Sequence, residues 1–402
     1  MQNKKQMALF WCIELFLCIY FMQLFNIPNK LTILIGGLIS IILLMQQKRI
    51  RIGLGTILLT LTMFSYFIIS EGVQGITMTI PYVGVLIYVL ADYLSCGITD
   101  EKEFEKLFFW FLVALITGYS IHGLLNSYLF LDGQLEPGNP RYWMDIWEQN
   151  YIPATWHVIF FLPVLASVFG AIVYIKKRKI ISILVGLVAL FFMYISIVSG
   201  SRTSIAIFAL VFCAQVVLYV ILEWHKVIQL LKDKKIRMIG LAMILIVVLF
   251  AFLLRNHEAV LSFKAMMGRS GGMFQNVRFR MQRRALEQLF LYPMGGRHMD
   301  FLGRNWAHNV WLDMANVSGL IPFFLFTGYT FLTIFELIKW LLKKDISVER
   351  KLLTAGIYIS FFLYYTVERG FEGSIHYMTP WFFINGLVHG ELNTKRGQSR
   401  VS

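Results

Sequence analysis

The turn Ser199-Gly200-Ser201-Arg202-Thr203 joins two strongly apolar segments and carries residues suited to binding phosphate. Ser201 or Thr203 can cap the helix that follows, and a helix N-terminus presents free backbone N–H groups and a partial positive charge to an anion. Arg202 adds a planar guanidinium that binds two phosphate oxygens at once. The alternative is that Arg202 extends to a membrane surface. The spacing of the turn favours neither phosphate binding nor contact with the membrane surface for Arg202.

A second basic group lies on a predicted amphipathic helix that runs from Asn276 to Pro293. The pattern predicts two stripes, one apolar and one charged: Phe279, Leu286, Leu289 and Phe290 on one, Arg280, Arg284 and Glu287 on the other. We expect Arg280 and Arg284 to turn inward towards a bound anion, with Arg278 as a further candidate ligand. The alternative is an interfacial helix that lies on anionic headgroups.

A third group begins at His308-Asn309, which opens a long apolar segment. A neutral imidazole at a helix N-terminus can act as a general base near neutral pH. A capping or interface histidine is the plainer alternative. Asp313 follows by about one turn and can orient another side chain. Asn309, Glu368 and Arg369 are expected to support the same site.

Other polar residues give weaker indications. Glu14 lies within the first apolar segment, where a carboxylate is either functional or simply hydrogen-bonded. The tryptophans and tyrosines of segment 132–153 can stack on sugar rings or form an aromatic belt at a membrane interface. The sequence has no P-loop, HExxH, CxxC or GxSxG motif, which argues against a nucleotide-driven pump, a zinc protease and a serine hydrolase. We expect neither a metal nor a cofactor.

The composition predicts a polytopic membrane protein. The chain has 402 residues, of which 57% are hydrophobic and only 15% charged, against about 25% in soluble domains. We predict an all-α bundle of about twelve transmembrane helices in one domain, 1–402. The expected spans are 7–25, 30–46, 53–70, 76–95, 107–131, 154–175, 180–198, 203–222, 238–254, 307–337, 352–367 and 373–390.

The basic residues predict the orientation. With both termini in the cytoplasm, every segment placed inside is basic. One outer loop, 255–306, is also strongly basic, with these basic residues: Arg255, Lys264, Arg269, Arg278, Arg280, Arg283, Arg284, Arg297 and Arg304. Only Glu258, Glu287 and Asp300 oppose them. Because the positive charge gathers at an outer face, we expect an anionic ligand there and no nucleic-acid partner.

Taken in order, these motifs resemble the O-antigen polymerase and O-antigen ligase superfamily of bacterial surface-glycan assembly. The resemblance covers roughly 180–340. It comprises the Ser-Arg-Thr turn, the arginine-bearing loop, the turn Pro293-Met294-Gly295-Gly296 and the His308-Asn309 motif, whose helix continues through Gly319 to Pro322. The family often has a tryptophan shortly after the loop arginine, whereas Gln282, Arg283 and Arg284 stand there in this chain.

The resemblance implies a metal-independent glycosyltransferase with a GT-C-like bundle, in the bacterial cytoplasmic membrane. Its donor would be a glycan on undecaprenyl diphosphate. Arg202, Arg280 and His308 would be catalytic, and Arg202, Arg280, Arg284 and Arg278 would bind the diphosphate. Polymerisation of repeat units is the favoured reaction, and transfer of a finished chain by a ligase is the alternative. A flippase and a chain-length regulator are the implied partners. A flippase for the same lipid-linked sugars is the rival function from another class.

Overall fold

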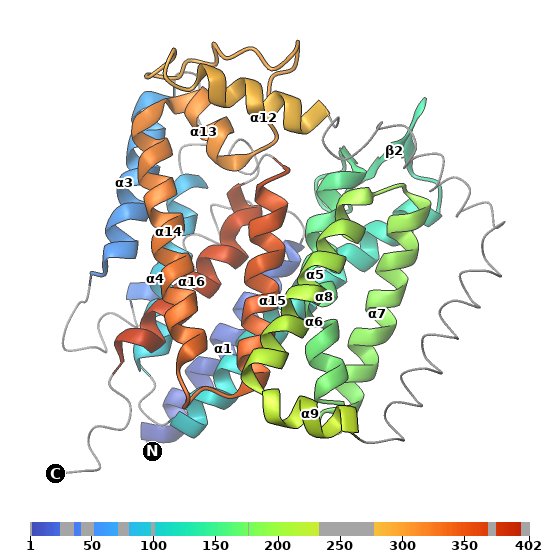
Figure 1. Cartoon of the computed structure of the whole chain (residues 1–402), viewed down its shortest axis with the longest axis vertical. Coiled ribbons are helices and arrows are strands. Elements are labelled where there is room, and N and C mark those ends of the chain that lie inside the picture. Colours follow the sequence, from blue (N-terminus) through green and yellow to red (C-terminus); the bar gives the residue numbers. More distant parts are fainter. Residues whose placement is uncertain are drawn as a thin grey trace.

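The protein is a bundle of α-helices with one small β-sheet (Figure 1). The structure, a computed structural model, describes residues 2–24, 36–41, 52–70, 80–97, 101–175, 177–232, 277–368 and 375–394. In chain order the α-helices are α1 (Gln2–Met22), α3 (Leu54–Ile69), α4 (Ile80–Gly97), α5 (Glu101–Leu131), α6 (Ala154–Val173), α7 (Lys179–Val198), α8 (Arg202–Leu222), α9 (Trp224–Lys232), α12 (Val277–Gln288), α13 (Val310–Ser318), α14 (Leu320–Leu342), α15 (Val348–Tyr365) and α16 (Thr379–Asn393).

The short elements lie between these helices. A 3-10 helix, η5 (Ile375–Met378), precedes α16. Strands β1 (Leu135–Glu136), β2 (Asn139–Met144) and β3 (Tyr151–Pro153) follow α5 and form an antiparallel sheet in the order β1-β2-β3. The sequence analysis expected only an outer loop at 132–153, so this sheet is an addition to the predicted fold.

Several helices have the length and composition of membrane spans, which confirms the predicted class of helical membrane protein. Within the described residues, α5, α6, α7, α8 and α14 are long and apolar enough to cross a membrane. The outer surfaces of α7 and α8 leave Ile180, Leu187, Leu190 and Ile221 exposed. Apolar surface of this extent is unfavourable in water. It is the expected surface of a helix that faces lipid hydrocarbon.

The twelve predicted spans differ from the structure in two respects. The expected span 307–337 is not one helix, because the chain breaks at Gly319 between α13 and α14. Gly319 has φ +80, a left-handed conformation that glycine adopts without steric cost. The expected span 238–254 and most of 30–46 lie outside the described residues, so the count of twelve stays a prediction.

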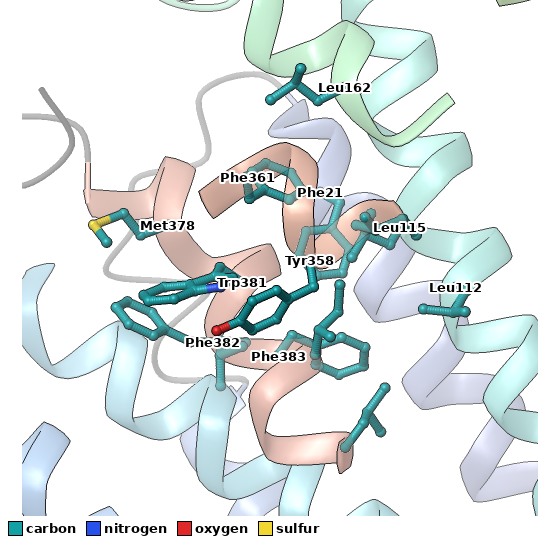
Figure 2. Packing of buried hydrophobic residues seen from close by; sticks show 14 of the residues in the cluster. Phe21, Leu112, Leu115, Leu162, Tyr358, Phe361, Met378, Trp381, Phe382 and Phe383 are labelled. Atoms are coloured by element: carbon teal, nitrogen blue, oxygen red, sulfur yellow. The ribbon is translucent and has the colours of Figure 1, made fainter. Parts of the chain in front are cut away.

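The core is rich in large aromatic side chains. Figure 2 shows Trp381, Phe382 and Phe383 of α16 gathered near Tyr358 and Phe361 of α15. Helices α4 and α16 come close enough that a Cβ added at Gly386 or Gly390 would collide with the α4 backbone. Small residues at such crossings let membrane helices approach closely, and dispersion contacts then stabilise the pair.

Ion pairs hold the helices together at the face opposite α12. Glu349 at the start of α15 accepts from Lys177 and Arg178 at 3.0 and 2.8 Å, which ties the α6–α7 turn to α15. Arg350 pairs with Glu391 of α16 at 3.0 Å. Helix α1 begins and α16 ends at this face as well (Figure 1). These ion pairs lie at the end of the bundle that is opposite α12, where charged side chains cost less than within a membrane.

A substitution at Gly319 tests the break between α13 and α14. The backbone N–H of Leu320 donates to Pro293 O at 2.8 Å, which docks the turn Pro293–Gly296 onto this break. A Cβ at Gly319 would collide with the backbone of Pro293 and Met294, besides straining the positive φ. We predict that Gly319→Ala lowers the free energy of unfolding by more than about 1 kcal/mol, seen as a lower unfolding temperature in detergent. Gly328→Ala on α14 is the matched control, since its added methyl group meets nothing within 4 Å. Equal unfolding temperatures for the two variants would contradict this role.

Candidate functional site

Helix α12 lies across one end of the bundle, above α13 and α14 (Figure 1). Its inward face carries Met281 and Ala285, which are buried in a small apolar cluster with Leu289, the residue after the helix, and Phe301. The predicted apolar stripe is therefore wrong in part. Leu289 is buried, but Phe279, Leu286 and Phe290 lie on the exposed surface. Because the buried face lies elsewhere on the helix, Arg278 and Gln282 face the protein instead of Arg280 and Arg284.

A buried carboxylate brings two of the predicted residues together. Glu368, just after α15, has no exposed side-chain surface. Its Oε1 lies 2.7 Å from Nη2 of Arg278, and its Oε2 lies 3.5 Å from Nδ1 of His308. Burying a carboxylate without a cation is costly, so these contacts account for its position. Arg278, Glu368 and His308, here termed the ionic triad, come from three separate parts of the chain.

The backbone around His308 is held in an uncommon conformation. His308 has φ +54, which costs free energy in a residue other than glycine. Asp313 accepts from the backbone N–H of Ala307 at 2.6 Å and from that of Asn309 at 3.1 Å, on either side of the histidine. Asp313 is itself buried. It therefore orients the backbone that carries His308, which gives a physical basis to its predicted supporting position.

Two further side chains fix the same loop to α12 and α15. Asn309 caps α13 by accepting from the backbone N–H of Leu312 at 3.2 Å, and its amide donates to Thr366 O at 3.3 Å. Gln282 of α12 donates to His308 O at 3.1 Å and to Thr366 O at 2.8 Å. Arg278 donates to Val367 O at 2.9 Å. The end of α15 is thus the common anchor of the triad.

The triad opens into a cavity of about 590 Å³. The opposite wall is formed by the β-sheet and the start of α6. The lining residues are Asn139, Arg141, Tyr142, Tyr151, Ile152, Pro153, Ala154, Thr155, Trp156, Arg278, Trp306, His308 and Glu368. Binding sites for small molecules typically combine such aromatic surface with a few convergent polar groups.

A buried polar network fixes the sheet to the bundle. Oδ2 of Asp145 accepts from Nδ2 of Asn126 at 2.8 Å and lies 2.8 Å from Nε2 of His122, and both partners belong to α5. His157 of α6 lies 3.1 Å from Asn126 and stacks on Trp143 at a ring separation of 3.9 Å. These five side chains are buried. The cavity wall is therefore a rigid part of the fold.

The structure separates the remaining predicted site residues from the cavity. Arg280 and Arg284 are exposed on α12 and do not line it, and Arg284 lies 3.8 Å from Asp300. Arg202 begins α8, partly buried, and is not among the lining residues. Ser201 occupies the predicted N-cap position of α8, but its side chain makes no capping hydrogen bond. Arg369 lies outside the described residues. The roles assigned to these arginines stay predictions.

Sequence reasoning missed three residues of this region. Gln282 could not be picked out because glutamines occur anywhere on helices. The one indication was that it stands where the resembled superfamily often has a tryptophan. Arg141 is a single basic residue in its segment, and Trp156 lies within an expected span, so neither belongs to a motif. Tyr142 and Tyr151 were noticed as aromatic residues of the outer segment, and both line the cavity.

No model of a known protein family matches the chain, and no curated protein matches it in sequence.

The polar network predicts a pH-dependent stability. Burial raises the pKa of Glu148 to about 7, and the neighbouring charge of Asp145 acts in the same direction. Burial would also raise the pKa of Asp145, but the hydrogen bond and charge of His122 and the bonds from Glu148 N–H and Asn126 lower it overall. The pKa of Glu148 is higher in the folded state than its ordinary value of 4.5. Its contribution to the free energy of unfolding is therefore fully present below the pKa of the unfolded state and is lost as pH rises through about 7.

We therefore predict that Glu148→Gln raises the unfolding temperature more at pH 8 than at pH 5. At pH 8 the wild type carries an ionised, largely buried carboxylate, and the glutamine removes that cost. Thermal unfolding in detergent at both pH values measures the difference. Asp132→Asn is the control, since Asp132 is exposed on the same outer segment. A gain for Glu148→Gln that is the same at both pH values would contradict the account.

Proposed function

We propose that the chain is a membrane glycosyltransferase that polymerises oligosaccharide repeat units carried on undecaprenyl diphosphate. The reaction takes place at the outer face of the bacterial cytoplasmic membrane and yields a surface polysaccharide such as O-antigen, capsule or exopolysaccharide. The observation that carries the proposal is the cavity at one end of a helical bundle in which a cation, a carboxylate and a histidine meet. The ordered motifs that resemble the polymerase and ligase superfamily support it.

The proposed reaction is a displacement at an anomeric carbon. A hydroxyl oxygen of the acceptor glycan attacks the anomeric carbon of the donor sugar, and a new C–O bond forms. The bond between that carbon and the diphosphate breaks, and its electron pair leaves with undecaprenyl diphosphate. The hydroxyl proton passes to His308. Fixed cations lower the barrier because they stabilise the charge that develops on the leaving diphosphate.

The geometry of His308 suits a general base. Glu368 Oε2 lies 3.5 Å from Nδ1, and no hydrogen bond joins the two atoms. In this proposal the neutral imidazole carries its proton on Nδ1, beside the carboxylate, and Nε2 accepts the proton of the acceptor. The negative charge of Glu368 also stabilises the imidazolium that forms. The side chain of His308 is about one-quarter exposed, which leaves it accessible from the cavity. Asp313 would act through the backbone of His308, as a positioning residue.

Arg278 is the loop arginine best suited to the diphosphate. It lines the cavity beside His308, whereas Arg280 and Arg284 are exposed away from it. Two of its contacts, to Glu368 and Val367 O, hold the guanidinium in one orientation. A guanidinium presents five N–H donors in a planar fork, a geometry that suits phosphate oxygens. Arg202 does not line the cavity, and we keep it as a proposed second cation at the N-terminus of α8. The buried hydroxyls of Ser199 and Ser201 beside it have no hydrogen-bond partner among the described residues.

The bundle also suits a lipid-linked substrate. The exposed apolar surfaces of α7 and α8 can accommodate the polyprenyl chain within the membrane. Lys177 and Arg178 at the opposite face follow the positive-inside pattern, which supports an outward-facing cavity and cytoplasmic termini. A polymerase of this kind works with a flippase that delivers the repeat unit and with a chain-length regulator.

Substitution of the triad tests the site assignment. We predict that Arg278→Ala, His308→Ala and Glu368→Gln each reduce polymer formation at least about 100-fold, because each removes charge stabilisation or proton transfer. Arg280→Ala should retain polymer, in contrast to the expectation from sequence, and serves as the matched control on the same helix. Membrane levels of all four variants are compared by immunoblot. Loss of product in Arg280→Ala with product retained in Arg278→Ala would overturn the assignment.

The size distribution of glycan from a deletion strain tests the reaction itself. We predict that long chains vanish while single repeat units remain, either on the lipid or capped onto the acceptor. Long chains that persist on undecaprenyl diphosphate and never reach the final acceptor would identify a ligase. Repeat units that accumulate on the inner leaflet would identify a flippase and contradict the proposed enzyme.

A further inference from the structure

The cavity wall opposite the ionic triad combines aromatic rings with an arginine. Asn139, Arg141, Tyr142, Tyr151 and Trp156, here termed the hairpin wall, all line the cavity. We propose that the hairpin wall is a glycan-binding subsite that selects sugars carrying an anionic group, such as the carboxylate of a uronic acid. This inference deepens the proposed function and rests on it for the position of the lipid diphosphate at the triad.

The aromatic residues supply surface for sugar rings. Aromatic rings provide a large apolar face, and the tyrosine hydroxyls add polar atoms at the edge of that face. Tyr151 is 38% exposed and Tyr142 is half-buried, so each has surface to offer to the cavity. Trp306 lines the same cavity from the side of the triad. A glycan that enters between the two sides would meet aromatic surface on both.

The charges of the cavity argue for an anionic ligand. Arg278 forms an ion pair with Glu368 at 2.7 Å. Arg141 is exposed, and no carboxylate of the described residues forms an ion pair with it. The lining residues therefore carry one positive charge beyond the Arg278–Glu368 pair. A guanidinium binds a carboxylate through two parallel hydrogen bonds, which makes Arg141 a selective partner for an acidic sugar.

The sheet holds the backbone of the strand that carries Arg141. In β2, Tyr142 pairs with Pro153, Trp143 with Ile152 and Met144 with Tyr151. Trp143 is fully buried against His157, so β2 is held on α6 next to Arg141. A preorganised wall binds a ligand without the entropy cost of ordering a flexible loop.

Binding of defined glycans tests the inference. The probes are an array of uronic-acid-containing oligosaccharides, each paired with its carboxyl-reduced counterpart, and farnesyl diphosphate as a sugar-free diphosphate. Purified full-length protein in detergent is compared with Arg141→Gln, Tyr151→Ala and Arg278→Ala. Arg283→Gln is the control, since its side chain is 83% exposed on α12.

We expect at least one acidic oligosaccharide to bind about tenfold more tightly than its reduced counterpart. Arg141→Gln should abolish that preference, Tyr151→Ala should weaken both members of the pair, and Arg283→Gln should change neither. Farnesyl diphosphate binding should fall in Arg278→Ala and stay unchanged in Arg141→Gln.

Three results would overturn the inference: no preference for any acidic oligosaccharide, a preference that survives in Arg141→Gln, or a loss of farnesyl diphosphate binding in that variant. The last result would assign Arg141 to the diphosphate. Oligosaccharide binding requires no turnover. These measurements therefore test the subsite alone, whereas the deletion strain tests the proposed reaction.

Discussion

The buried carboxylate of Glu368 is the feature on which the candidate site depends. An ionised carboxylate without solvent contact is stable only beside cations or hydrogen-bond donors. Glu368 meets this requirement with Arg278 from α12, and His308 from the loop before α13 lies 3.5 Å from its second oxygen. One electrostatic constraint therefore positions a cation and an imidazole that are separated in the sequence by thirty residues. The same arrangement has the parts needed to stabilise a leaving diphosphate and to accept a proton.

The rest of this end of the bundle is organised around this contact. Asp313, Asn309 and Gln282 hold the backbone near His308, so the strained residue stays in place. The facing wall is built independently, through the buried contacts of Asp145 with α5. Two walls with separate supports can keep a fixed spacing. A fixed spacing suits a reaction that must align a hydroxyl with an anomeric carbon.

The sequence predicted the helical class and the approximate positions of many helices because hydropathy decides which segments can enter a membrane. It failed where hydropathy carries no information. The break at Gly319 depends on a single positive φ, and the short strands β1 to β3 depend on pairing across a hairpin. At the site, spacing identified His308 and the helix that bears the arginines. It could not tell whether Arg278 or Arg280 turns inward, because that depends on which face of α12 is buried.

The most direct test of the central claim is the turnover rate of the purified protein in liposomes with an oligosaccharide on undecaprenyl diphosphate. The Arg278→Ala/His308→Ala double variant is compared with each single variant. If the triad acts as one unit, the double variant loses little more activity than the worse of the two single variants, because groups that act together are not additive. Losses that simply multiply, or turnover that remains at the wild-type rate, would contradict a catalytic site organised by Glu368.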